Sequence, residues 1–156
     1  MRRLLTTVVL LASKLSLAAV SCSVTATGPA FGTYNPLNAS ATFANGLVTA
    51  TCTLLSGGTT TVNLVSSYST GSSGTYANRT LLSGANSLNY NLYYDAGYTQ
   101  VRGNGTGGSS TGSASITLTP AQPTGQAQGT IYGRILASQD VAPGSYLDTI
   151  IVTVTY

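Results

Sequence analysis

Few side chains in this sequence could perform acid–base or metal chemistry. The chain of 156 residues contains no histidine and no glutamate, and its three aspartates are Asp95, Asp140 and Asp148. A Ser-His-Asp triad, general acid–base catalysis and ordinary zinc ligation therefore lack their usual participants. Asp95 with Asp140 or Asp148 could hold calcium, but scattered acids are more typical of turns and of arginine partners. We predict a protein that is not an enzyme and holds no metal or cofactor.

Two glycine-rich motifs match known functional patterns by letter. Residues 103–108 fit GxGxxG, and residues 108–112 fit GxSxG. No helix is predicted after the first motif to direct its dipole at a phosphate, and the serine of the second has no base in the chain. Both motifs belong to a low-complexity segment, 103–113, which we expect to be a surface loop like residues 66–75.

The N-terminus has the three parts of an export signal. A basic Met-Arg-Arg head precedes a mostly apolar segment, 4–12, and residues 19–21 place small side chains where a signal peptidase reads them. Lys14 interrupts the apolar stretch, which argues against a membrane-spanning helix of roughly 20 apolar residues. We therefore predict a signal peptide at residues 1–21 and no transmembrane segment in the mature chain.

Removal of this leader changes the electrostatics. Residues 22–156 keep three arginines and three aspartates, so their formal charges cancel. The pI near 9.0 of the whole chain is due to the basic residues of the leader. A basic surface for nucleic acid is thus absent, and we expect no nucleic-acid partner. The remaining segment of about 135 residues is long enough for one domain with its own core.

Cys22 and Cys52 are the two cysteines of the chain. In an exported protein such a pair is typical of one disulfide, which would close a loop of about 30 residues and stabilise the fold by roughly 3–4 kcal/mol. Free thiols and lipidation of Cys22 are the alternatives. Acylation usually follows a leucine-like residue three positions before the cysteine, where Ala19 stands.

Apolar and polar residues alternate with a period of two along the mature chain, which predicts strands. The predicted strands are residues 22–27, 41–44, 47–52, 59–65, 87–95, 113–119, 129–136 and 145–156. Asn45 and Gly46 separate two of them with the strongest short-range signal for a two-residue hairpin. No segment favours a helix, because the connections are rich in glycine, serine and threonine. The pattern predicts an all-β sandwich in one domain.

The predicted terminal strand lacks a neighbour. One face carries Ile150, Val152, Val154 and Tyr156, and the other carries Ile151, Thr153 and Thr155. An apolar strand at the end of an all-β domain needs a partner on each edge, and no later segment supplies one. We expect the partner strand to come from another protein and to lie in a groove between these four residues and Val24. The alternative is a complete sandwich in which the same residues pack internally.

Seven segments follow the order and spacing of a known family. They are CSV at 22–24, FGTY at 31–34, TC at 51–52, NRTL at 78–81, LNYNLYYD at 88–95, IYGRI at 131–135 and GSYLDTIIVTVTY at 144–156. Across nearly the whole mature chain the sequence resembles the spore coat protein U family, which includes the Csu-type pilins of archaic chaperone–usher pili.

This resemblance implies an incomplete immunoglobulin-like β-sandwich that lacks its final strand. Its expected partners are a periplasmic chaperone, an outer-membrane usher and other pilus or coat subunits, one of which donates the missing strand. The resemblance also implies that Cys22 and Cys52 pair, and that the protein is exported through the periplasm to a cell surface, pilus or coat. Self-polymerising members carry a strand-donating extension before the first cysteine, whereas here Cys22 directly follows the predicted cleavage point. We therefore expect the protein to accept a strand without donating one.

A secreted carbohydrate-binding adhesin module is the alternative function. The chain contains ten tyrosines, and exposed aromatic rings can stack on sugars. The candidates for such stacking are Tyr68, Tyr76, Tyr93, Tyr94 and Tyr98.

Overall fold

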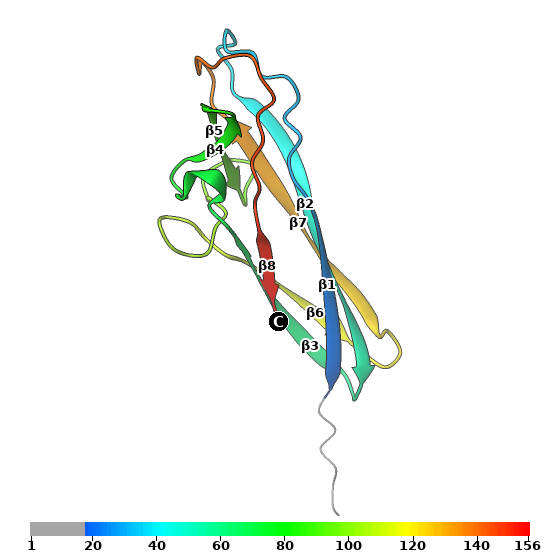
Figure 1. Ribbon diagram of the computed structural model, residues 1–156. Coiled ribbons are helices and arrows are strands. Elements are labelled where there is room, and N and C mark those ends of the chain that lie inside the picture. The colour runs from blue at the N-terminus through cyan, green and yellow to red at the C-terminus, as the bar shows by residue number, and fades with distance from the viewer. Residues whose placement is uncertain (1–17) are drawn as a thin grey trace, which may run out of the picture.

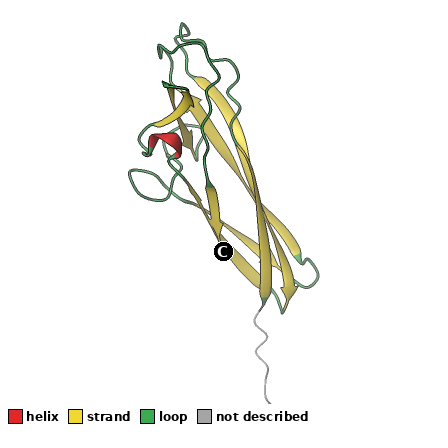
Figure 2. Ribbon diagram, viewed as in Figure 1, coloured by secondary structure: helices red, strands yellow, loops and turns green. Residues whose placement is uncertain are grey.

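The alternating segments form two antiparallel sheets that pack face to face, as seen in the computed structural model, which describes residues 18–156 (Figures 1 and 2). The larger sheet has the order β1 (Ala19–Thr27), β2 (Thr42–Ser56), β7 (Thr124–Ile135), β5 (Asn86–Tyr93) and β4 (Arg79–Ser83). The smaller sheet has the order β6 (Gly112–Leu118), β3 (Thr60–Tyr68) and β8 (Val152–Thr155). One 3₁₀ turn, η1 (Gly71–Ser73), follows β3. The predicted all-β sandwich is confirmed.

The core lies between the sheets because every second residue of each strand points inward. One cluster of buried residues contains Val48, Tyr68, Leu88, Tyr90, Leu92, Ile131 and Ile135. A second cluster contains Ala50, Cys52, Leu54, Val62, Leu64, Ile116 and Leu118. The predicted inward face of residues 87–95 is confirmed for Leu88, Tyr90 and Leu92, which are at most 4% exposed.

The predicted hairpin at Asn45 and Gly46 is wrong. Strand β2 continues through both residues, and each pairs with β7, Asn45 with Tyr132 and Gly46 with Ile131. The glycine serves close packing instead of a turn. A Cβ atom at Gly46 would lie 2.9 Å from the backbone carbon of Gly28 and would collide with the Thr27 carbonyl oxygen. Only glycine lets the end of β1 cross β2 at this distance.

Several other strand boundaries also differ from the prediction. The predicted terminal strand 145–156 is mostly irregular, and β8 covers only its last part. Strand β4 was not predicted, and β7 begins five residues earlier than expected, at Thr124. Strand β1 begins at Ala19, whereas residues 1–17 of the predicted signal peptide lie outside the described part of the chain.

Two arginines are buried in the sandwich, Arg79 at 0% and Arg102 at 3% exposure. The Arg79 guanidinium donates to the carbonyls of Ser69 and Arg102 and to the Asn91 side chain. A buried cation is tolerated only when its donors are satisfied, so these bonds fix the loops that supply the carbonyls. Burial lowers the Arg79 pKa below its ordinary value.

Candidate functional site

Strands β1 and β8 each stand at the end of a sheet and each pair with one neighbour. Strand β1 pairs with β2, and β8 pairs with β3 from Tyr68–Val152 to Val65–Thr155. No backbone hydrogen bond joins β1 to β8 within residues 18–156. The two strands therefore border an unpaired edge of the sandwich, which we call the open edge (Figure 1).

The register of β1 shows which of its backbone groups face the open edge. The Cα atoms of Cys22 and Cys52 lie 4.1 Å apart, which fits a non-hydrogen-bonded antiparallel pair at about 4.5 Å better than a bonded pair at about 5.5 Å. The N–H and C=O of Cys22 therefore point away from β2. By the alternation of the ladder, the same groups of Val20 and Val24 point the same way.

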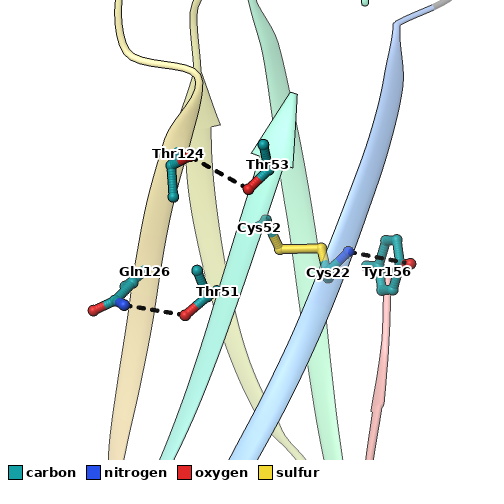
Figure 3. The surroundings of a disulfide bond; sticks show 7 residues. All are labelled: Cys22, Thr51, Cys52, Thr53, Thr124, Gln126 and Tyr156. Carbon is teal, nitrogen blue, oxygen red and sulfur yellow. Dashed lines mark hydrogen bonds between the residues drawn. A yellow bond between two sulfur atoms is a disulfide. The ribbon is translucent and has the colours of Figure 1, made fainter. Parts of the chain in front are cut away.

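A disulfide joins β1 to β2 at this pair (Figure 3). Cys52 is 0% exposed, and the half-buried Val20 and Cys22 pack against the second core cluster. The predicted disulfide is thus confirmed, and it excludes the free-thiol and lipidation alternatives for Cys22. Its position holds the edge strand on the sheet while leaving the outward backbone groups of that strand without a neighbouring strand.

Strand β8 presents the other wall of the open edge. Val152 and Val154 are half-buried against the core, whereas Ile151 is 66% exposed on the opposite face. Ile150 lies just before the strand and also packs on the first core cluster. The predicted alternation is therefore present at Ile150, Ile151, Val152 and Val154, although the two isoleucines lie before the strand begins.

The segment before β8 is held by one backbone bridge to β4 and by side-chain hydrogen bonds. Leu147 and Leu82 exchange backbone hydrogen bonds of 3.0 and 2.8 Å. The Asp148 carboxylate accepts hydrogen bonds from the Tyr90 hydroxyl at 2.7 Å and from the Ser72 hydroxyl at 2.7 Å. Burial and this carboxylate raise the pKa of Tyr90 above its ordinary value. These contacts fix where β8 begins.

Two cavities lie between the sheets, and residues of the β8 side of the open edge take part in the lining of both. The first has a volume of about 190 Å³ and is bordered by Ala50, Ala127 and Gly129 of the larger sheet and by Ala114 and Val154 of the smaller one. We call it the Ala127 cavity. Larger side chains, among them Leu64, Tyr94 and Arg102, complete its lining.

The second cavity lies further along the same edge. It has a volume of about 340 Å³, and its lining includes Ala26 and Gly28 on the β1 side and Ile150 and Val152 on the β8 side. We call it the Ile150 cavity. Protein interiors are normally close-packed, so a cavity of this size at the open edge indicates space that another molecule can fill.

A stripe of small residues on β7 explains why the Ala127 cavity exists. Gly125, Ala127 and Gly129 face inward opposite Cys52, Ala50 and Val48 of β2. At Gly125 the opposite sheet fills the space, since a Cβ atom there would lie 2.5 Å from Ile116 and 3.2 Å from Leu118. At Ala127 the facing residue of β2, Ala50, is also small, and both line the cavity. A Cβ atom at Gly129 would instead lie 3.3 Å from Val48 and 3.6 Å from Arg102. This stripe was not predicted, although the sequence shows small residues at alternate positions there.

The structure brings most of the predicted groove residues to the open edge. Val24 of β1 pairs with Ala50 of β2, and its side chain is 39% exposed. Val152, Val154 and Ile150 lie on the β8 side and line the cavities. Tyr156 is 62% exposed, and its hydroxyl oxygen accepts a hydrogen bond of 3.4 Å from the Cys22 N–H (Figure 3).

The tyrosines considered for sugar stacking are mostly structural. Tyr68, Tyr76 and Tyr93 are 2%, 8% and 7% exposed, so their rings are not free to stack on a sugar. Tyr94 lies over Arg102 and borders the Ala127 cavity, and Tyr98 packs edge-on against Tyr93. Three of the five candidate rings are therefore buried.

Comparison with protein families identifies the chain. The spore coat protein U domain matches residues 6–153. The chain belongs to the spore coat protein U family. This confirms the resemblance carried by the seven segments, and the sandwich described above is this chain's version of the family domain.

A similar fold occurs in a pilus subunit complex. The spore coat protein U chain resembles a chain in the crystal structure of the CsuC–CsuE chaperone–tip adhesion subunit pre-assembly complex from the archaic chaperone–usher Csu pili of Acinetobacter baumannii, with a TM-score of 0.56 and 18% identity. The match covers 88% of this chain and 40% of that one, so the chain spans about two fifths of its neighbour's length. No curated protein matches the sequence.

The residues that could support other functions are few in this family member. Across residues 18–156 no three metal-ligating side chains of the histidine, cysteine or acidic kind come together. No helix in that range is long and apolar enough to cross a membrane.

Proposed function

We propose that this spore coat protein U domain is a structural subunit of a chaperone–usher pilus or surface coat, and that it is completed by a strand donated by a partner. The observation that carries the proposal is the open edge, where β1 and β8 each lack a second neighbour and where the Ile150 cavity is lined from both sides. Main-chain hydrogen bonds to such an edge supply affinity, and alternate side chains in the cavities supply specificity.

An unfilled edge is unfavourable for a secreted protein on its own. Unpaired backbone groups beside half-buried valines are a template for aggregation. A periplasmic chaperone would cover the edge during export, an outer-membrane usher would receive the complex, and another pilus or coat subunit would supply the permanent strand. The few charges outside residues 1–17, three arginines and three aspartates, suit display at the cell surface. The signal peptide at 1–21 and the domain at 22–156 remain predictions of this proposal.

The proposal is tested by giving the chain its own missing strand. The protein is extended after Tyr156 by an Asn-Gly turn and a strand of alternating valine and threonine. We expect the extended protein to be a soluble monomer whose Tm rises by roughly 10 °C or more, because several valines become buried. A matched extension with aspartate at each valine position should leave the Tm unchanged.

The contrary outcome is equally clear. If the unextended protein is a stable monomer whose β1 and β8 edge amides resist hydrogen exchange, and if the valine extension adds no stability, the sandwich is already complete. The donated-strand proposal is then overturned.

A further inference from the structure

One side chain spans the open edge. The Tyr156 hydroxyl accepts the hydrogen bond from the Cys22 N–H, although 134 residues separate the two. Within residues 18–156 this is the one hydrogen bond between β1 and the segment that contains β8. The Tyr156 ring is 62% exposed, so burial does not hold it there.

The N–H group that Tyr156 uses belongs to the edge ladder of β1. Because Cys22 forms a non-hydrogen-bonded pair with Cys52, its N–H faces the open edge. A strand added to β1 would place a backbone carbonyl oxygen at about 2.9 Å from that nitrogen. The phenol oxygen of Tyr156 stands on the same side of β1, where that carbonyl would lie.

We propose that Tyr156 is a displaceable latch on the open edge, whose hydroxyl occupies the place of a partner carbonyl until a strand arrives. The inference rests on the proposed function, since only an incoming strand offers the competing carbonyl. At 3.4 Å the bond is longer than the usual 2.7–3.2 Å for N–H to O, and it is exposed to water. Such a bond is weak enough for a strand to replace.

The latch also limits which kinds of partner can bind to β1 at Cys22. Cys22 lies on the part of β1 where Val20 and Cys22 pack on the core together with Val154. A partner must therefore be an extended segment that brings a carbonyl to Cys22 and displaces the Tyr156 ring. A small molecule or a helix offers no row of backbone carbonyls along β1.

The hydrogen bond itself is tested by amide exchange of the free protein. In the wild type we expect the Cys22 amide to exchange more slowly than the Val24 amide, although both face the open edge. Tyr156→Phe removes only the hydroxyl, so the Cys22 amide should then exchange about as fast as that of Val24. Tyr132→Phe is the matched control, because Tyr132 lies on β7 away from the open edge and should leave both amides unchanged.

The competition is tested with a fluorescent peptide of alternating valine and threonine that is long enough to span β1. We expect Tyr156→Phe and Tyr156→Ala to bind it roughly two- to fivefold faster than the wild type, as loss of one weak hydrogen bond allows. Tyr132→Phe should bind at the wild-type rate. In the complex, the Cys22 amide should be protected in every form of the protein.

The possible failures are distinct. If the peptide binds and the rates of all four proteins are equal, the latch is overturned and the proposed function stands. If the peptide binds to none of them, the proposed function and the latch fall together. A Cys22 amide that exchanges at the same rate in the wild type and in Tyr156→Phe also overturns the latch.

Discussion

The guanidinium carbon of Arg102 lies 3.9 Å from the centre of the Tyr94 ring. The same side chain donates hydrogen bonds to the Tyr93 carbonyl, the Tyr68 hydroxyl and the Thr130 carbonyl. No carboxylate forms an ion pair with it within residues 18–156, so the charge is stabilised by ring faces and carbonyl oxygens. Arg102 thereby connects β3, β5 and β7 at the border of the Ala127 cavity.

Replacing this cation should destabilise the fold strongly. Arg102→Met leaves two carbonyls and one hydroxyl buried without their donor, and each unsatisfied group costs about 1–3 kcal/mol. We expect a loss of roughly 3–5 kcal/mol in the free energy of unfolding, measured by urea denaturation. Arg134→Met is the matched control, because Arg134 also lies over tyrosine rings but is half-buried, and its side chain makes one hydrogen bond within residues 18–156, to the Tyr93 hydroxyl. Its expected loss is about 1 kcal/mol, and equal losses would contradict the role assigned to Arg102.

Removing the disulfide should loosen one edge of the sandwich. The bond closes a sequence separation of 30 residues, and the double substitution Cys22→Ser with Cys52→Ser should lower the free energy of unfolding by about 3 kcal/mol. Amide exchange should accelerate first in β1, because this edge strand pairs only with β2 within residues 18–156. Uniform acceleration in all strands would show that the disulfide does not act locally.

Filling the Ala127 cavity should impair strand binding without harming the fold. Ala127→Val places two methyl groups in a space of about 190 Å³, so the free energy of unfolding should change by less than about 1 kcal/mol. The affinity for the valine–threonine peptide should fall by about tenfold, because one of its side chains loses its site. Gln126→Val lies on the exposed outer face and should bind the peptide normally. Unchanged affinity of Ala127→Val would show that the cavity does not receive the strand.

Alkaline pH should unfold the protein through its buried tyrosines. The pKa values of Tyr68 and Tyr90 are raised above the usual 10.0, in both cases chiefly by burial. A raised folded-state pKa gives stability that is complete below the unfolded value and is lost as pH rises above about 10. Denaturant midpoints measured from neutral to strongly alkaline pH should show this loss. Tyr90→Phe should flatten the decline, whereas Tyr132→Phe should follow the wild type.

Strands with an unbroken alternation of apolar and polar residues were predicted correctly from the sequence. The prediction of a turn failed at a glycine, a residue type that serves both turns and close packing. The Leu88, Tyr90 and Leu92 face was correct because burial on one side of a sheet enforces period two. Gly46 was taken for a turn residue, but the backbone of Gly28 is what requires it. A glycine needed for close approach and one needed for a turn look the same in a sequence.

The open edge was predictable in outline but not in detail. The alternation around Val152 and Val154 indicated a strand with one missing neighbour, and the structure places both residues there. The shortened start of β8 was not predictable, because it depends on the contact of Asp148 with Tyr90, which is 58 residues away in the sequence. Burial of Arg79 and Arg102 was equally hidden, since arginine is usually exposed.

The packing of two arginines removes most trypsin sites from the surface of this domain. Residues 18–156 contain no lysine, and Arg79 and Arg102 are withdrawn from solvent. Trypsin therefore finds little to cleave on the native domain, and amine-directed crosslinkers and aldehydes find no lysine there to modify. Digestion at Arg79 or Arg102 requires the sandwich to open first, so the appearance of those fragments in a trypsin time course would report unfolding rather than surface cleavage.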